Sequence, residues 1–117
     1  MESRYWPVIK QAYAGFNARD IDQVFAVMVD QVHWPKAFEG GHVVGKDAVS
    51  AYWLRQWSEI NPRVEPLAIS EREDGKLEVL VSQLVRDLEG NILFDGQTRH
   101  VYAFDGDMIV SMDVEAA

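Results

Sequence analysis

Residues 92–114 read ILFDGQTRHVYAFDGDMIVSMDV and indicate the fold more directly than any other stretch. Gly106 and Asp107 are typical of a two-residue hairpin loop. The hydrophobic period changes from helical to two after Pro62, which predicts strands over Ile92–Phe104 and Met108–Val114 on either side of that loop. The first of these strands is long enough to need a bend or a bulge. This stretch therefore predicts an antiparallel hairpin.

Further strands precede this hairpin along the chain. Residues Val64–Arg72 and Leu77–Asp87 also alternate with a period of two, and Gly75 and Gly90 lie in the turns that follow them. Consecutive strands joined by short turns pair with their neighbours. The second half of the sequence therefore predicts an antiparallel meander.

The first half of the sequence has helical spacing instead. Its predicted elements are a helix near Tyr5–Phe16, a short helix that begins after Asp20 with a capping box to Gln23, a short strand at Val32–Pro35, a loop at Phe38–Gly45 and a helix over Lys46–Ser58. Helices followed by a meander predict an α+β fold in which the helices pack on one face of a curved sheet. The length of 117 residues fits a single domain over residues 1–117.

Composition excludes several classes of function. Asp and Glu outnumber Lys and Arg by 19 to 11, and a formal net charge of −8 disfavours nucleic-acid binding. The sequence has no cysteine, which excludes disulfides, thiolate metal sites and cysteine nucleophiles. The three histidines have no metal-ligand spacing, and no glycine-rich phosphate loop occurs, so we expect no metal and no cofactor. Without a signal-peptide pattern or a membrane-length apolar run, we expect a soluble, cytoplasmic protein.

The predicted hairpin brings two ionisable residues together. If Asp105 pairs with Met108, an unbroken register places His100 opposite Asp113, with side chains about 5 Å apart on one face. Asp113 could then orient His100 as a general base, or it could itself be the base while His100 holds a substrate oxygen. Alternatively, the pair is a buried hydrogen-bonded pair that only holds the strand register.

Aromatic residues supply a candidate pocket lining. Tyr13, Phe16, Trp53 and Trp57 recur at helical spacing, and Tyr102 shares the predicted face of His100. Such rings are often plain core, but the polar tips of Tyr and Trp need a partner when buried, and a ligand can provide it. Gln83 lies within an apolar strand. It either donates a hydrogen bond into the pocket or faces a dimer interface.

The order of elements and several local strings resemble the nuclear transport factor 2-like superfamily, and within it the SnoaL-like and ketosteroid-isomerase-like proteins. The strings are Tyr13–Asp20, Val32–Pro35, Gly45–Val49 and the final hairpin with His100 and Asp113. The resemblance covers nearly the whole chain. It implies a cystatin-like roll, in which a cone-shaped curved sheet wraps around the long first helix and leaves an apolar pocket. It also implies a homodimer that pairs through the outer face of the sheet.

The resemblance bears on individual positions as well. SnoaL-like cyclases carry an acid/base aspartate on the last strand and a histidine on the strand before it, and Asp113 and His100 look like those positions. Ketosteroid isomerases have a proton-moving aspartate before a proline, where this sequence has Trp34 before Pro35. An indole cannot accept that proton. Steroid isomerisation by that mechanism is therefore not expected, and Trp34 would instead narrow the pocket or stack on a ligand.

Three functions fit this combination. The first is a cofactor-independent isomerase, cyclase or lyase-type enzyme that moves protons next to a carbonyl of a small apolar substrate, with His100 and Asp113 as its catalytic residues. The second is a binding module whose pocket takes up a small apolar ligand without reaction. The third is a dimerisation module in which Trp34, Trp53 and Trp57 close the cone completely.

Overall fold

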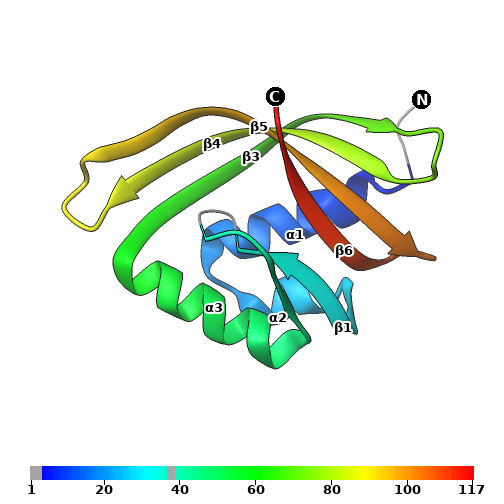
Figure 1. Cartoon of the computed structure of the whole chain (residues 1–117), viewed down its shortest axis with the longest axis horizontal. Helices are drawn as coiled ribbons and strands as arrows, with labels where there is room; N and C mark the ends of the chain where they lie inside the picture. Colours follow the sequence, from blue (N-terminus) through cyan, green and yellow to red (C-terminus); the bar gives the residue numbers. More distant parts are fainter. Residues whose placement is uncertain (1–3, 37–38) are drawn as a thin grey trace.

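Six strands form one curved sheet around the first helix. In the computed structural model, which describes residues 4–36 and 39–117, the sheet order is β2-β1-β6-β5-β4-β3. The elements in chain order are α1 (Trp6–Ala18), α2 (Ile21–Phe25), β1 (Met28–Pro35), β2 (His42–Val44), α3 (Lys46–Glu59), β3 (Ile60–Glu71), β4 (Leu77–Asp87), β5 (Ile92–Asp105) and β6 (Met108–Ala116). Figure 1 shows α1 beneath the twisted strands β3, β4 and β5. The predicted α+β fold is confirmed.

The strand pairing departs from the prediction at one place. The pairs β3–β4, β4–β5 and β5–β6 form the predicted antiparallel meander, but β1 runs parallel to β6. A hairpin loop imposes antiparallel pairing, whereas β1 reaches β6 from the helical half of the chain and can pair in either direction. The sheet is therefore mixed and not antiparallel throughout.

The helices follow the predicted pattern closely. The α2 helix begins after Asp20, whose carboxylate accepts a hydrogen bond from the Gln23 backbone N–H at 3.2 Å, as the capping box predicts. The α3 helix covers the predicted range and ends one residue later. Of the loop predicted at Phe38–Gly45, Phe38 lies outside the described residues, and His42–Val44 forms the short strand β2 instead of loop.

The core lies between α1, α3 and the concave face of the sheet. Ile9, Ala12 and Tyr13 on α1 are buried, as expected for one stripe of an amphipathic helix. Gly15 allows α1 and α2 to approach each other closely. A Cβ placed on it would lie 2.8 Å from a methyl carbon of Val24, which is shorter than any ordinary contact.

The end of α1 is fastened to β3 by two side chains. Asn17 pairs with the backbone of Val64 in both directions, donating to its carbonyl at 2.7 Å and accepting from its N–H at 2.9 Å. Arg19 ends the helix in the left-handed conformation, with φ of 61°. Its guanidinium donates to the carbonyl groups of Phe16 and Pro62 and to the side chain of Asn61. These bonds connect the last turn of α1 with the start of β3.

The β5–β6 hairpin contains a bulge, whereas the prediction assumed an unbroken register. Asp105 pairs with Met108, as predicted from the Gly106-Asp107 loop. The register shifts between Ala103 and Phe104, because Phe104 pairs with Ile109 whereas Ala103 pairs with Ser111, which leaves Val110 as an extra residue. Every pair beyond this bulge is displaced by one position on β6. A displacement of one residue moves side chains to the opposite face of the sheet.

The outer face of the sheet carries a network of charges. Arg72 donates to Glu78 at 2.7 Å and to Glu115 at 2.8 Å, and so connects β4 with β6. Large apolar side chains are instead exposed near the turn of the β4–β5 hairpin, which projects beyond α3 in Figure 1. These side chains belong to Leu88, Ile92, Leu93 and Phe94.

Candidate functional site

A cavity opens between the helices and the concave face of the sheet. Its volume is about 80 Å³, where the volume is the region that the centre of a water molecule can occupy. One water needs only about 10–15 Å³ on this measure, so the cavity has room for more than a single solvent molecule. The residues that line it are Ala12, Tyr13, Phe16, Val24, Trp34, Pro35, Tyr52, Trp53, Gln56, Pro62, Val64, Gln83, His100, Tyr102, Met112 and Val114.

Strand alternation and helical spacing bring these residues together. Tyr13 and Phe16 are three residues apart on α1 and project from the same face of the helix. His100 and Tyr102 are two residues apart on β5 and therefore lie on the same face of the sheet. Gln83 on β4 also faces the cavity, which is the first of the two predicted alternatives, and not a dimer interface.

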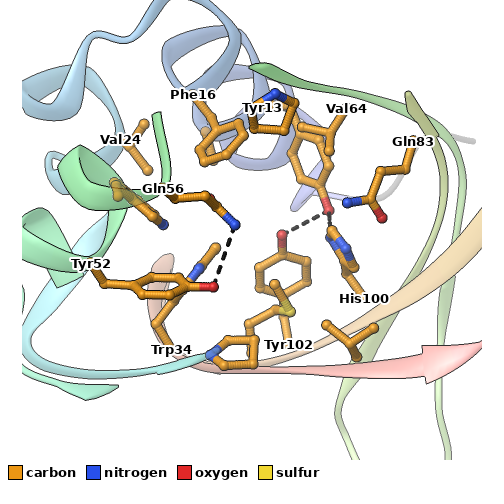
Figure 2. A pocket seen from close by; sticks show the side chains of 16 residues that line it. Tyr13, Phe16, Val24, Trp34, Tyr52, Gln56, Val64, Gln83, His100 and Tyr102 are labelled. Carbon is orange, nitrogen blue, oxygen red and sulfur yellow. Dashed lines mark hydrogen bonds between the residues drawn. The ribbon is translucent and has the colours of Figure 1, made fainter. Parts of the chain in front are cut away.

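Three polar groups in the cavity wall form a hydrogen-bonded chain. The Tyr102 hydroxyl donates to the Tyr13 hydroxyl oxygen at 2.8 Å, and the Tyr13 oxygen lies 2.7 Å from His100 Nδ1. Figure 2 shows the three side chains converging on one side of the cavity, with the amide of Gln83 beside them. We call Tyr13, His100 and Tyr102 the Tyr–His network.

Burial determines the protonation of the Tyr–His network. Desolvation lowers the pKa of His100 from 6.5 to about 4, because a buried imidazolium loses its hydration. The same desolvation raises the pKa of Tyr13 well above its usual value of 10, and it also raises the pKa of Tyr102. At neutral pH the network therefore consists of a neutral imidazole and two neutral hydroxyl groups.

A second polar pair lies on the other side of the cavity. The Gln56 side-chain N–H lies 3.4 Å from the Tyr52 hydroxyl oxygen, and Figure 2 shows this pair across the cavity from the Tyr–His network. Aromatic rings separate the two polar regions. Trp34 and Trp53 meet edge to face with ring centroids 5.3 Å apart, and Phe16 packs against Trp53 in the same way at 5.5 Å.

The predicted pairing of His100 with Asp113 is wrong. Because Val110 is an extra residue, His100 pairs with Val114, and Asp113 pairs with Val101. Asp113 does not line the cavity. Its carboxylate lies 2.7 Å from His42 Nε2, in a pair whose side chains are 48% and 38% exposed. The structure thus separates the two residues that were predicted to act together.

The prediction for Trp57 also needs correction. Trp57 packs against Phe16 and Trp53, with centroid distances of 5.3 and 5.9 Å, but it does not line the cavity. The Arg19 guanidinium lies 5.0 Å from the centroid of the Trp57 ring, which places this side chain against the end of α1. Its Nε1 is buried and has no hydrogen-bond partner among the described residues.

Several lining residues were not among the predicted site residues. Tyr52 and Gln56 are four residues apart on α3, and their spacing alongside Trp53 could have identified them. Met112 and Val114 reach the cavity because of the Val110 bulge. The sequence signal for them is the alternation of apolar Val110, Met112 and Val114 with polar residues.

The described part of the chain shows neither a metal cluster nor a membrane-spanning helix. In residues 4–36 and 39–117, no cluster of three or more His, Cys, Asp or Glu side chains is arranged to hold a metal ion. Over the same part of the chain, no helix has both the length and the apolar character needed to cross a membrane.

Solved structures share this architecture. TerC co-crystallised with polyporic acid superposes with a TM-score of 0.84 at 21% identity, covering 98% of this chain and 92% of the other. A protein of unknown function from Burkholderia pseudomallei, described as NTF2-like, gives 0.83 at 23% identity, covering 99% and 92%. A candidate polyketide cyclase from Xanthomonas campestris gives 0.75 at 15% identity, covering 95% and 88%. The chain thus has the nuclear transport factor 2-like fold found in SnoaL-like and ketosteroid-isomerase-like proteins. No protein-family model and no curated protein sequence matches it.

Proposed function

We propose that the protein binds a small, mostly apolar molecule in the cavity, and that the Tyr–His network holds the polar end of this ligand. The observation that supports it is the cavity wall itself, which is apolar and aromatic except for a few convergent polar groups. Ligand pockets have this composition, because apolar walls supply affinity and a few polar groups supply orientation. TerC, which has the same fold, was crystallised with polyporic acid, and this also supports the proposal.

A thermal-shift screen with steroid-like, polyketide-like and terpenoid compounds tests this proposal. A ligand that binds only the folded state raises the melting temperature according to its concentration and affinity. Val114 lines the cavity and is 40% exposed, so Val114→Trp should fill the cavity mouth without disturbing the core. The matched control is Val44→Trp, because Val44 is 47% exposed and does not line the cavity.

We expect at least one compound to stabilise the wild type and Val44→Trp but not Val114→Trp. Equal stabilisation of all three proteins would place binding elsewhere and contradict the proposal. No stabilisation by any compound class would contradict it as well.

A second candidate is acid–base catalysis next to a carbonyl. The observation that favours it is the neutral imidazole of His100, hydrogen-bonded to Tyr13 inside an apolar cavity. In such a reaction His100 would accept a proton from the carbon beside the carbonyl, and the electron pair of the broken C–H bond would form an enolate. A pKa of about 4 makes His100 a weak base, since an efficient general base has a pKa near the working pH. Binding is therefore the better-supported function.

Deuterium exchange separates the two candidates. A catalytic protein would accelerate loss of the α-protons of a bound ketone in D₂O, followed by NMR, and His100→Gln would abolish the acceleration. A ketone that binds without any accelerated exchange contradicts catalysis by His100 but leaves the binding function in place.

A further inference from the structure

A cluster of apolar side chains ends the β4–β5 hairpin, which projects beyond α3 (Figure 1). The four side chains are each 41–59% exposed, and they belong to Leu88, Ile92, Leu93 and Phe94. Single exposed apolar residues are normal on a protein surface, whereas a contiguous apolar patch indicates an interaction site. We call these four side chains the hairpin tip.

Hydrogen bonds hold the loop of the hairpin tip in one shape. The Asp87 carboxylate accepts hydrogen bonds from the backbone N–H groups of Glu89 and Asn91 at 3.0 and 2.8 Å. It also accepts one from the side-chain amide of Asn91 at 3.0 Å. Because these bonds order the loop in advance, the hairpin tip loses little conformational entropy when it binds a partner.

The hairpin tip carries an excess of negative charge. Residues 86–95 contain three carboxylates, on Asp87, Glu89 and Asp95, and one cation, Arg86. Glu89 is exposed in the turn, directly after Leu88. A carboxylate at this position disfavours insertion into a lipid bilayer, because the charge would lose its hydration. The hairpin tip therefore matches an apolar surface that has cations beside it.

A hollow with these properties lies between α1 and β3. Its volume is about 560 Å³ on the measure used for the cavity, and its apolar lining includes Trp6, Ala14 and Pro66. We call this hollow the α1–β3 groove. It provides apolar contact area outside the cavity.

The charged residues of the α1–β3 groove are mostly basic. Lys10 and Arg63 both line it, and Glu65 is the one acidic residue in its described lining. Glu65 lies 2.8 Å from Arg63, whereas the Lys10 ammonium lies 5.1 Å from the centroid of the Trp6 ring. A locally positive groove in a chain with a formal net charge of −8 favours an acidic partner.

The edge of β3 in this groove is unsuited to an added strand. Both the N–H and the C=O of Val64 are bonded to Asn17, and Pro66 has no N–H to donate. A peptide that extends a sheet pairs through such backbone groups. The α1–β3 groove therefore suits a compact loop that binds through its side chains.

The hairpin tip does not reach the α1–β3 groove of its own chain. Val64 pairs with Gln83, and Leu88 lies five residues further along the hairpin, about 16 Å away in an extended strand. Paired strands do not fold back over such a distance. A contact between these two surfaces therefore joins two copies of the chain.

We infer that the hairpin tip of one copy docks into the α1–β3 groove of a second copy. Leu88 packs against the apolar wall of the groove, and Glu89 lies close to Lys10. The two surfaces are different patches of one chain, so the contact is heterologous, and its repetition gives a ring or an open chain of molecules. The contact is small, so the association is weak and needs a high protein concentration.

Sedimentation equilibrium of the full chain, from micromolar to millimolar concentration, tests the inference. We expect the weight-average mass of the wild type to rise at least twofold over this range. A closed dimer through the sheet would set only the starting mass. Leu88→Asp removes the apolar contact, and Lys10→Glu makes the groove negative, so each variant should keep its starting mass at every concentration.

Matched controls separate these effects from a general change in charge. Leu54→Asp introduces the same carboxylate at an exposed position on α3, and Lys76→Glu reverses an exposed charge in the β3–β4 turn. Neither residue belongs to the hairpin tip or the groove. Both controls should associate as the wild type does.

A mixture of the two variants identifies the contact as heterologous. Leu88→Asp keeps an intact groove, and Lys10→Glu keeps an intact hairpin tip. An equimolar mixture at millimolar concentration should therefore have a weight-average mass at least half as large again as that of either variant alone. A contact between two hairpin tips would give no such increase, because one component has lost its tip.

Several outcomes would overturn the inference. They are a wild-type mass that stays constant with concentration, a rise in Leu88→Asp or Lys10→Glu equal to that of the wild type, and a mixture no heavier than its components. Binding of the wild type to phosphatidylcholine vesicles that Leu88→Asp abolishes, without any rise in wild-type mass, would instead assign the hairpin tip to a membrane. Ligand binding in the cavity does not depend on any of these results.

Discussion

At the scale of single residues, burial of His100 contributes to the acid sensitivity of the protein. The folded state lowers the pKa of His100 from 6.5 to about 4, so between these pH values the unfolded chain binds a proton that the folded chain does not. Stability therefore falls as the pH decreases from 6.5 towards 4, and this contribution does not change further below that range. The full effect is about 3 kcal/mol, since one pKa unit corresponds to 1.36 kcal/mol.

We expect His100→Gln to weaken this pH dependence. Between pH 7 and pH 5, urea unfolding of the wild type should show a larger loss of unfolding free energy than the variant, because glutamine does not titrate. His33→Gln is the matched control, since His33 is exposed and does not line the cavity. Equal slopes for the wild type and His100→Gln would show that His100 is solvated in the folded protein.

Arg19 combines a strained backbone with a cluster of hydrogen bonds. Arg19→Ala removes the bonds to Phe16, Asn61 and Pro62 but keeps a side chain at a φ of 61°, where glycine is favoured. We expect a loss of about 2 kcal/mol of unfolding free energy in urea titrations. Arg19→Gly relieves the backbone strain and should lose about 1 kcal/mol less. A glycine variant that is less stable than the alanine variant would contradict this account.

At the scale of elements, the contact between α1 and α2 depends on Gly15. Helix propensity alone predicts that Gly15→Ala stabilises the protein by about 1 kcal/mol. The 2.8 Å approach of a new Cβ to Val24 predicts the opposite, a loss of about 1–3 kcal/mol from overpacking. Thermal and urea unfolding should show destabilisation. Ala14→Gly at the exposed neighbouring position measures the propensity term separately, and a stabilised Gly15→Ala would show that the helices separate easily.

The elements also show how far the sequence predicts this protein. Hairpin loops and strand periods are local signals, and Leu77–Asp87 forms β4 over the predicted range. The Val110 bulge leaves only a weak local signal, a break in the alternation where Met108, Ile109 and Val110 are all apolar. Packing against the core then decides which face of the strand is buried. The interpretation of Asp113 as a catalytic residue depended on that register. In contrast, the prediction that Tyr13, Trp34 and Gln83 line the cavity did not depend on the β5–β6 register. The structure places all three in the cavity wall.

At the scale of the whole molecule, a homodimer through the outer face of the sheet stays a prediction. Leu84 lies on that face, because its neighbours Gln83 and Val85 point inward. Towards the start of β4, on the same outer face, Arg72, Glu78 and Glu115 offer both signs of charge to a second copy related by a two-fold axis.

Light scattering should therefore give twice the mass of one chain. Leu84→Arg should reduce it to a monomer, because the substitution buries an unpaired charge in the interface. Leu54→Arg is the control, since Leu54 is exposed on α3 and lies away from the sheet. A monomeric wild type, or a dimer that survives Leu84→Arg, would contradict the prediction.

The double hydrogen bond between Asn17 and Val64 has a consequence for solubility. β3 is an edge strand, and free N–H and C=O groups on such an edge can template pairing with another chain. The Asn17 amide occupies both groups of Val64 and thus acts as a one-residue substitute for a seventh strand. Asn17→Leu should therefore form thioflavin-positive fibrils at concentrations where Ala14→Leu, equally apolar but away from the edge, remains clear. Whether the protein stays dissolved or forms fibrils would then depend on the side-chain amide of Asn17.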